Sequence, residues 1–204
     1  MKVAVRLPVT VKTRIGIDDM DDYQGLQELT ARVVAAGCDS LTVHARKAWL
    51  KGLSPKENRD IPPLNYPRVY QLKADFPDLE IVVNGGITDS DQVKEHLGRC
   101  DGVMIGRAAY QNPWWLARLE REHFNAGFSP DRHGVVEAML PYIEEQLLAG
   151  AQLKHITRHM LGLFQAMPGA KQWRRHLSER AHLPGAGPEL VREAAAKVSP
   201  ECAA

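Results

Sequence analysis

The hydrophobic residues of this chain fall into short runs that alternate with longer stretches of helical periodicity. Runs rich in valine, isoleucine and leucine predict strands at residues 9–16, 40–46, 80–86 and 102–108. Apolar residues recurring every three or four positions predict helices at residues 22–37, 66–77, 88–100 and 108–124. Because the strand runs are nearly continuous, we expect an α/β fold whose parallel sheet is covered on both faces.

A second pattern begins after about residue 128. The turn-forming segment SPDRHG is followed by helical periodicity alone as far as residue 182, in segments at residues 134–151, 153–167 and 169–182. The breaker LPGAGPE then precedes a last expected helix at residues 189–198. The sequence therefore predicts two domains, an α/β domain at residues 1–127 and an all-α helical domain at residues 128–204.

Composition narrows the class of protein without naming its chemistry. A net charge of +1 gives no global attraction to nucleic acid, so such a contact needs a local basic patch. No apolar run is long enough to span a membrane, and the N-terminal residues lack the features of a signal peptide. Three widely spaced cysteines, Cys38, Cys100 and Cys202, argue against a disulfide framework or a structural zinc site. We expect a cytoplasmic monomer without a metal.

Polar or glycine residues stand at the C-terminal end of every predicted strand. They are Lys12 and Arg14, then His44 and Arg46, then Asn84, Gly85 and Gly86, and finally Gly106 and Arg107. Ligands bind at this end of the strands in both barrels and open parallel sheets. We therefore predict a ligand site formed by these strand ends.

The glycines at the last two strand ends favour a phosphate group. Glycine lets a phosphate approach backbone N–H groups, a helix N-terminus adds partial positive charge, and Arg107 adds a fork of donors. Lys12 and His44 suit a ring system, because a cation stabilises the charge that builds up when a ring is reduced. The alternatives are a tight turn at Gly85 and Gly86, a surface lysine and an ordinary core histidine.

Four segments carry a resemblance to a known family: PVTVKTRIGIDD, HARKAWLKGLSPKENRDIPPLNY, VVNGGI and DGVMIGRAAYQNPW. They resemble the flavin-dependent tRNA-dihydrouridine synthases, the second segment the DusA subfamily in particular. The resemblance continues through the helical region and implies an FMN-binding (β/α)8 barrel of the TIM type followed by a helical tRNA-binding domain. It implies reduction of a D-loop uridine in tRNA to 5,6-dihydrouridine, with NADPH as electron donor.

The resemblance also assigns roles to residues. It implies that Lys12 and His44 contact the flavin, and that the flavin phosphate is held by Asn84, Gly85, Gly86, Gly106 and Arg107. The family's active-site cysteine stands in a Cys-Pro pair, and this sequence contains no such pair. We therefore assign no catalytic residue, and interpret the chain as strands five to eight of the barrel plus the helical domain.

Basic residues cluster where the resemblance places the RNA. The candidates in the loop after the second strand are Arg46, Lys56 and Arg59, and those in the helical part are Lys171, Arg174 and Arg175. Lysine and arginine contact phosphates, whereas a solvated charged face is the ordinary alternative. We expect Trp173, which lies among them, to be a packing residue.

Two other functions fit parts of this pattern. A barrel enzyme could use the glycine-rich strand ends for a sugar phosphate without a flavin, although the basic helical domain does not fit that function. A non-catalytic RNA-binding remnant is the second alternative, because the chain lacks the active-site cysteine.

Overall fold

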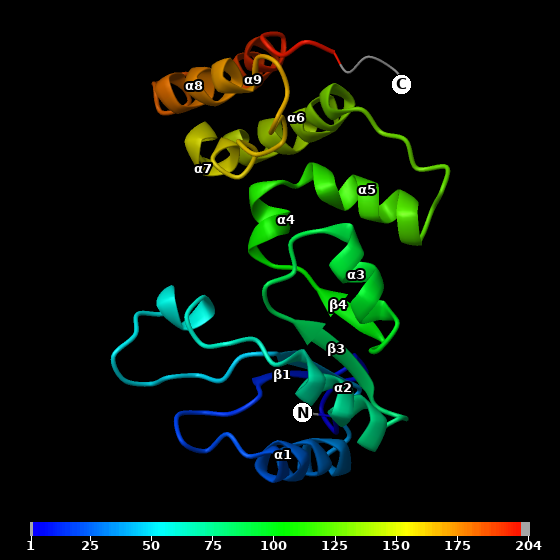
Figure 1. The fold of residues 1–204 in the computed structure, drawn as a ribbon. Helices are drawn as coiled ribbons and strands as arrows, with labels where there is room; N and C mark the ends of the chain where they lie inside the picture. Colours follow the sequence, from blue (N-terminus) through cyan, green and yellow to red (C-terminus); the bar gives the residue numbers. More distant parts are fainter. Residues whose placement is uncertain (1, 201–204) are drawn as a thin grey trace. The chain divides into compact units, whose positions relative to one another are not determined.

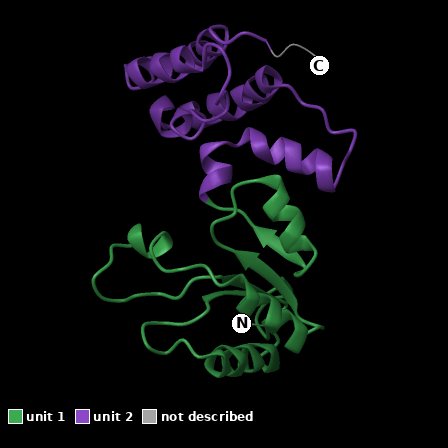
Figure 2. Cartoon of the chain, in the orientation of Figure 1, with its two compact units in different colours: residues 1–106 green, residues 107–204 purple. Residues whose placement is uncertain are grey.

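A computed structural model gives the structure of residues 2–200, which form two compact units (Figures 1 and 2). Unit 1 ends at Gly106 and unit 2 begins at Arg107. The division lies before the predicted boundary at residue 127, so the helices just after the last strand belong to unit 2. Contacts explain this assignment, since the Tyr110 hydroxyl lies 2.7 Å from His159 Nδ1 and the Arg132 guanidinium lies over the Trp114 ring.

Unit 1 contains a four-stranded parallel sheet in the order β1-β2-β3-β4. The strands are β1 (Thr10–Arg14), β2 (Ser40–His44), β3 (Glu80–Asn84) and β4 (Gly102–Met104). The connecting helices are α1 (Tyr23–Ala35), α2 (Tyr66–Asp75) and α3 (Ser90–Leu97), and a short 3-10 helix covers Glu57–Arg59. The α/β class and all four strand positions were predicted correctly.

Side-chain polarity distinguishes the two faces of this sheet, whereas the sequence suggested strands that are apolar almost throughout. Paired residues of parallel strands share a face, and successive residues alternate between faces. One face carries Leu41, Val43, Ile81 and Val83, which form a buried core with residues of α1 and α2. The other face carries polar side chains at Lys12, Arg14, Thr42, His44 and Asn84. The runs looked continuous because aliphatic residues were counted without regard to this alternation.

Side-chain caps fix where the helices of unit 1 begin. Asp22 accepts a hydrogen bond from Gly25 N at 2.6 Å, and Asn65 accepts one from Arg68 N. Asp89 does the same for Gln92 N at 2.9 Å. Each cap satisfies a backbone donor that the first turn of a helix leaves unpaired. The caps therefore determine where each helix begins after the loop that follows the preceding strand.

The regular elements of unit 2 among its described residues are all helices, joined by turns and loops. Its helices are α4 (Arg107–Gln111), α5 (Trp114–His123), α6 (Arg132–Leu148), α7 (Leu153–Thr157), α8 (Ala170–Arg180) and α9 (Pro188–Ala195). The Trp173 side chain is fully buried and its ring meets that of Phe164 edge-on at 4.9 Å. The prediction that Trp173 packs in the core is confirmed.

One helical prediction in unit 2 was wrong. The periodicity of residues 153–167 suggested one helix, but α7 ends at Thr157 and turns follow. A Cβ at Gly162 would lie 2.2 Å from the Gln111 carbonyl oxygen, so the chain passes close to the end of α4 there. Ala166 then adopts φ 65°, which an α-helix does not permit. This tertiary approach overrides the local pattern.

Within residues 2–200, no helix is both long and apolar enough to cross a membrane. The same residues contain no group of three His, Cys, Asp or Glu side chains able to hold a metal ion.

Candidate functional site

The strand ends of unit 1 lie side by side in register. Arg14 pairs with His44, His44 with Asn84, and Asn84 with Met104. Lys12 lies two residues before Arg14 on the same face of the sheet, where it pairs with Thr42. The His44 side chain is buried, so it is not a surface residue, whereas Lys12 is exposed and the surface-lysine alternative still applies to it. The predicted clustering of Lys12, His44 and Asn84 is therefore present.

Gly85 and Gly86 form a tight turn at the end of β3. Both have positive φ, 116° and 69°, a region that favours glycine. A Cβ at Gly85 would lie 2.5 Å from His44 Cδ2, and a Cβ at Gly86 would lie 2.6 Å from Leu64 Cδ1. The turn thus needs glycine for its own packing, so the tight-turn interpretation holds alongside any ligand role. The bare backbone at Gly85 also makes room for the His44 ring.

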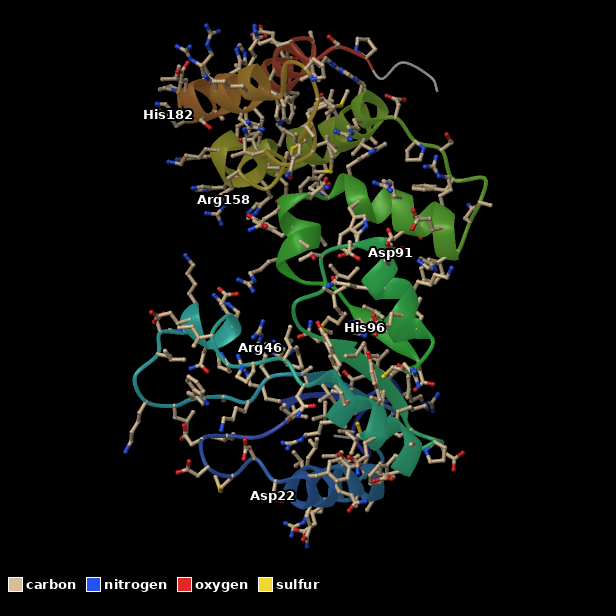
Figure 3. All side chains as sticks on the ribbon, viewed as in Figure 1. Asp22, Arg46, Asp91, His96, Arg158 and His182 are labelled. Atoms are coloured by element: carbon tan, nitrogen blue, oxygen red, sulfur yellow. The ribbon has the colours of Figure 1, made fainter. Side chains whose placement is uncertain are left out.

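Tyr66 holds this turn from the start of α2, and the sequence analysis did not identify it. Its hydroxyl donates a hydrogen bond to the Gly85 carbonyl at 2.6 Å. Its ring packs 4.3 Å from His96 on α3 (Figure 3), whose Nδ1 lies 2.7 Å from the Tyr70 hydroxyl. Burial lowers the pKa of His96, which favours the neutral ring. The glycine turn therefore rests on an uncharged, packed support.

Asn84 and the start of α3 have bonds of their own. Asn84 Nδ2 donates to the Met104 carbonyl at 2.8 Å, which ties the ends of β3 and β4 together. At the start of α3, the side chains of Asp89 and Gln92 accept hydrogen bonds from backbone N–H groups at Gln92 and Thr88. Three donors near the predicted phosphate position, Asn84 Nδ2 and the backbone N–H groups of Thr88 and Gln92, are therefore occupied. The turn and the nearby cations remain the stronger anion-binding features.

Four cations surround the N-terminal half of this row: Lys12, Arg14, Arg46 and Arg59. Burial first, and then Arg14, lower the pKa of Lys12. Burial first, and then Arg46 and Arg59, lower the pKa of Arg14. No carboxylate is among the causes of either shift, so Lys12 and Arg14 have no described counter-charge. Such a cluster favours an anionic ligand.

Arg14 and Arg46 also order the loop that follows β2. Arg14 Nη1 donates to the carbonyls of Lys47 and Asn58 at 2.9 and 2.8 Å. Arg46, where the loop leaves the sheet (Figure 3), donates to the Pro62 carbonyl. Arg46 Nε is buried without a hydrogen-bond partner in the described residues, so one donor remains for a ligand.

The remaining candidates fall in different places. A Cβ at Gly106 would meet no described atom within 4 Å, so the backbone there is open. Arg107 begins α4 and belongs to unit 2. Lys56 is exposed in the loop of unit 1, whereas Lys171, Arg174 and Arg175 are exposed on α8. Arg175 forms an ion pair with Glu179 at 2.8 Å.

The two cysteines that the structure describes lie away from the strand ends. Cys38 and Cys100 occupy the turns before β2 and β4, as predicted, while Cys202 lies outside the described residues. Burial raises the pKa of Cys100 to about 11. This thiol is therefore protonated at neutral pH and unsuited to act as a nucleophile.

Cys100 is accordingly expected to resist alkylation in the folded protein. Iodoacetamide at mildly alkaline pH should label Cys38, which is partly exposed, much faster than Cys100. Peptide mapping by mass spectrometry measures both rates, and denaturant should make them equal. Rapid labelling of Cys100 in the native protein would contradict this assignment.

Comparisons with known proteins agree with one another. The family model for dihydrouridine synthase (Dus) matches residues 1–199. A tRNA-dihydrouridine(20/20a) synthase of Vibrio vulnificus (strain CMCP6) is 59% identical, over 98% of this chain and 62% of the relative. Synthases of the same name from Yersinia pestis and Salmonella typhi are 58% and 59% identical, over 98% and 95% of this chain and 59% of each relative. The chain thus spans about three fifths of the length of these relatives.

Proposed function

Since the chain belongs to the dihydrouridine synthase family, we propose that it takes part in the flavin-dependent reduction of uridine to 5,6-dihydrouridine in the D-loop of tRNA. FMN is the proposed cofactor and NADPH the proposed electron donor, in a cytoplasmic and monomeric enzyme. When bound, the flavin supplies the electrons that reduce the uracil ring. The observation that carries the proposal is the cation cluster at the strand ends, where Lys12 and Arg14 have no described counter-charge.

The residues at the strand ends fit such a cofactor. Lys12 and His44 would face the ring system, where a lysine ammonium stabilises negative charge. Gly85, Gly86 and Gly106 would present bare backbone to the phosphate, and Asn84 and Arg107 would add polar contacts. The open backbone at Gly106 and the unpartnered Arg46 Nε leave room and a donor for an anion.

We further propose that β1 to β4 are strands five to eight of an eight-stranded TIM barrel, and that unit 2 contributes to tRNA binding. The sequential parallel order supports the first part, as does a polar face opposite the helix-covered face. The exposed basic residues Lys171 and Arg174 on α8 support the second part, and the exposed Lys56 supports a further RNA contact from the loop after β2.

The proposed chemistry assigns no proton-donating cysteine to this chain. Cys38 and Cys100 precede their strands, whereas the candidate site lies at the opposite ends of the strands. We therefore propose that the chain holds the flavin and the RNA, and that the acid that protonates uracil is not among its described cysteines.

Flavin binding and dihydrouridine formation test the proposal separately. Titration of the recombinant chain with FMN should quench flavin fluorescence, and expression in a strain lacking the enzyme should restore dihydrouridine in tRNA, measured by mass spectrometry. Thermal-shift assays with sugar phosphates serve as the comparison for a barrel enzyme without flavin. Stabilisation by sugar phosphates but not by FMN would reject the flavin function.

The non-catalytic alternative has its own signature. An RNA-binding remnant would bind tRNA with a steep dependence on salt and would neither bind FMN nor form dihydrouridine. The missing Cys-Pro pair is the observation that favours this alternative. The two assays together distinguish it from the enzyme.

A further inference from the structure

Two pockets of unit 2 share the side chain of His159, and neither belongs to the site at the strand ends. Each has a volume of about 500 Å³, which lies within the range of small-ligand sites. No Asp or Glu lines either pocket. The two pockets differ in chemistry, one being apolar and the other basic.

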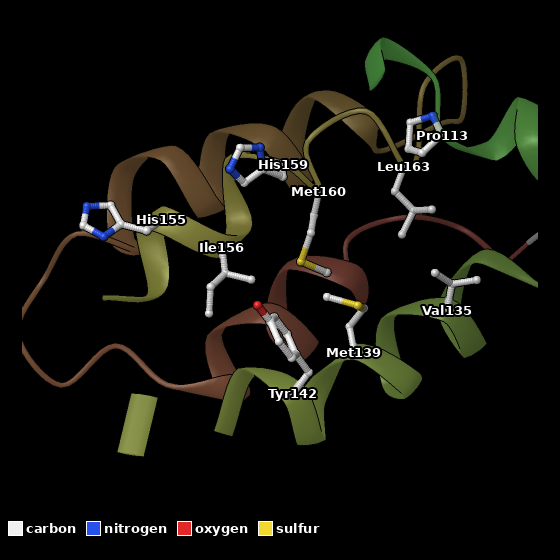
Figure 4. Close-up of a pocket in the computed structure, with 9 residues that line it drawn as sticks. All are labelled: Pro113, Val135, Met139, Tyr142, His155, Ile156, His159, Met160 and Leu163. Atoms are coloured by element: carbon white, nitrogen blue, oxygen red, sulfur yellow. The ribbon is translucent and has the colours of Figure 1, made fainter. Parts of the chain in front are cut away.

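The first pocket suits a flat apolar group. Met139, Tyr142, Ile156 and Met160 point toward one another across it (Figure 4). Methionine sulfur and a tyrosine ring make favourable contacts with the faces of aromatic rings. The Tyr142 side chain is 47% exposed, so the pocket opens to solvent and can admit a group from outside.

The second pocket suits an anion. Arg158 and Arg174 line it together with Gln111 and Gln165. Both arginines are exposed, and neither forms an ion pair with an acidic residue in the described part of the chain. Two guanidinium groups at one pocket form a favourable site for a phosphate.

His159, which lines both pockets, is held in one tautomer by two hydrogen bonds. Arg158 Nε can only donate, so its 3.0 Å hydrogen bond makes His159 Nε2 an acceptor. His159 Nδ1 then carries the proton and donates to the Tyr110 hydroxyl at 2.7 Å. The basic pocket is also bordered by Ala166, whose φ of 65° is rare for a residue with a side chain. Backbone strain of this kind is common at binding sites.

We propose that the two pockets together bind one unstacked nucleotide of an RNA. Its base enters the apolar pocket, and its phosphate binds Arg158 and Arg174. The proposal deepens the function proposed above and rests on it, because it assumes that RNA is the ligand of unit 2. RNA is favoured over a free nucleotide because both pockets open to solvent, which lets a strand continue on either side.

Short single-stranded RNA carrying one 2-aminopurine tests the proposal on the full chain. Arg174→Gln should weaken binding and reduce the slope of log affinity against log salt by about one. Met139→Trp, which fills the apolar pocket, should weaken binding about five- to tenfold and abolish the change in 2-aminopurine emission. Because Met139→Trp could perturb folding, Tyr142→Ala provides a second variant with the same expectation at a more exposed position.

Arg121→Gln is the matched control. It removes one positive charge from an exposed position on α5 that lines neither pocket, and should leave affinity and salt slope unchanged. RNA binding unaffected by the three pocket variants would overturn this inference and leave the proposed function standing. Binding of free uridine monophosphate to the two pockets, with RNA binding unchanged in all three variants, would also overturn it. If the wild-type chain neither binds FMN nor forms dihydrouridine, the proposed function itself is rejected instead.

Discussion

Gly85→Ala is expected to destabilise unit 1 by about 3 kcal/mol or more, through two separate effects. The first is backbone strain, because φ at Gly85 is 116°. The second is a collision, because the new Cβ would lie 2.5 Å from His44 Cδ2 and 2.9 Å from His44 Nε2. The His44 ring is buried and cannot simply swing into solvent. Hydrogen exchange by mass spectrometry should show the loss of protection at β2 and β3.

Two glycines separate these effects. Gly52 has φ 83° but no described atom within 4 Å of its Cβ position, so Gly52→Ala reports backbone strain alone, about 1 kcal/mol. Gly106 is open and its φ is not positive, so Gly106→Ala should leave stability within about 0.5 kcal/mol. It should nevertheless weaken FMN binding if the phosphate approaches this backbone. Equal destabilisation by Gly85→Ala and Gly52→Ala would show that the collision between the new Cβ and the His44 ring adds nothing to the backbone strain.

The sequence could predict the strands and which residues meet at the edge of the sheet that holds the candidate site. Apolar runs place all four strands, and the C-terminal ends of parallel strands necessarily meet at one edge. Lys12, His44 and Asn84 were therefore brought together by topology alone. Thr42 was missed at this edge, and it follows from the same topology once the alternation of side chains is considered.

Other features depend on contacts that a linear pattern does not contain. Tyr66 reaches the Gly85 carbonyl from 19 residues earlier in the chain, which only the path of the loop after β2 determines. The end of α7 at Thr157 depends on the close approach of Gly162 to Gln111. The division at Gly106 likewise depends on contacts of α4 and α5 with later helices. In each case a distant segment decides the local structure.

Lys12→Met is expected to change stability and flavin binding in opposite directions. Lys12 is exposed, but partial desolvation of its ammonium group and the charge of Arg14 both lower its pKa, and so both disfavour its charged form. Removing the charge should therefore leave the ligand-free fold as stable as the wild type or more stable. The proposed contact with the flavin would be lost, and a missing charged hydrogen-bond partner lowers affinity about ten- to a hundredfold. Urea unfolding and FMN fluorescence titration measure the two quantities.

The pH dependence of the free energy of unfolding gives an independent test of the effect of the Lys12 charge. Because the pKa of Lys12 is lower in the folded chain than its ordinary value of 10.5, the unfolded chain binds more protons between these two pKa values. The free energy of unfolding contributed by Lys12 therefore rises with pH across that interval, and the rise should vanish in Lys12→Met. Lys94→Met, at an exposed position on α3, should retain the rise and bind FMN normally. A Lys12→Met protein that is less stable than the wild type and binds FMN with unchanged affinity would identify Lys12 as a structural residue. A cation that serves ligand binding is expected to destabilise the ligand-free fold, so its removal should not lower stability.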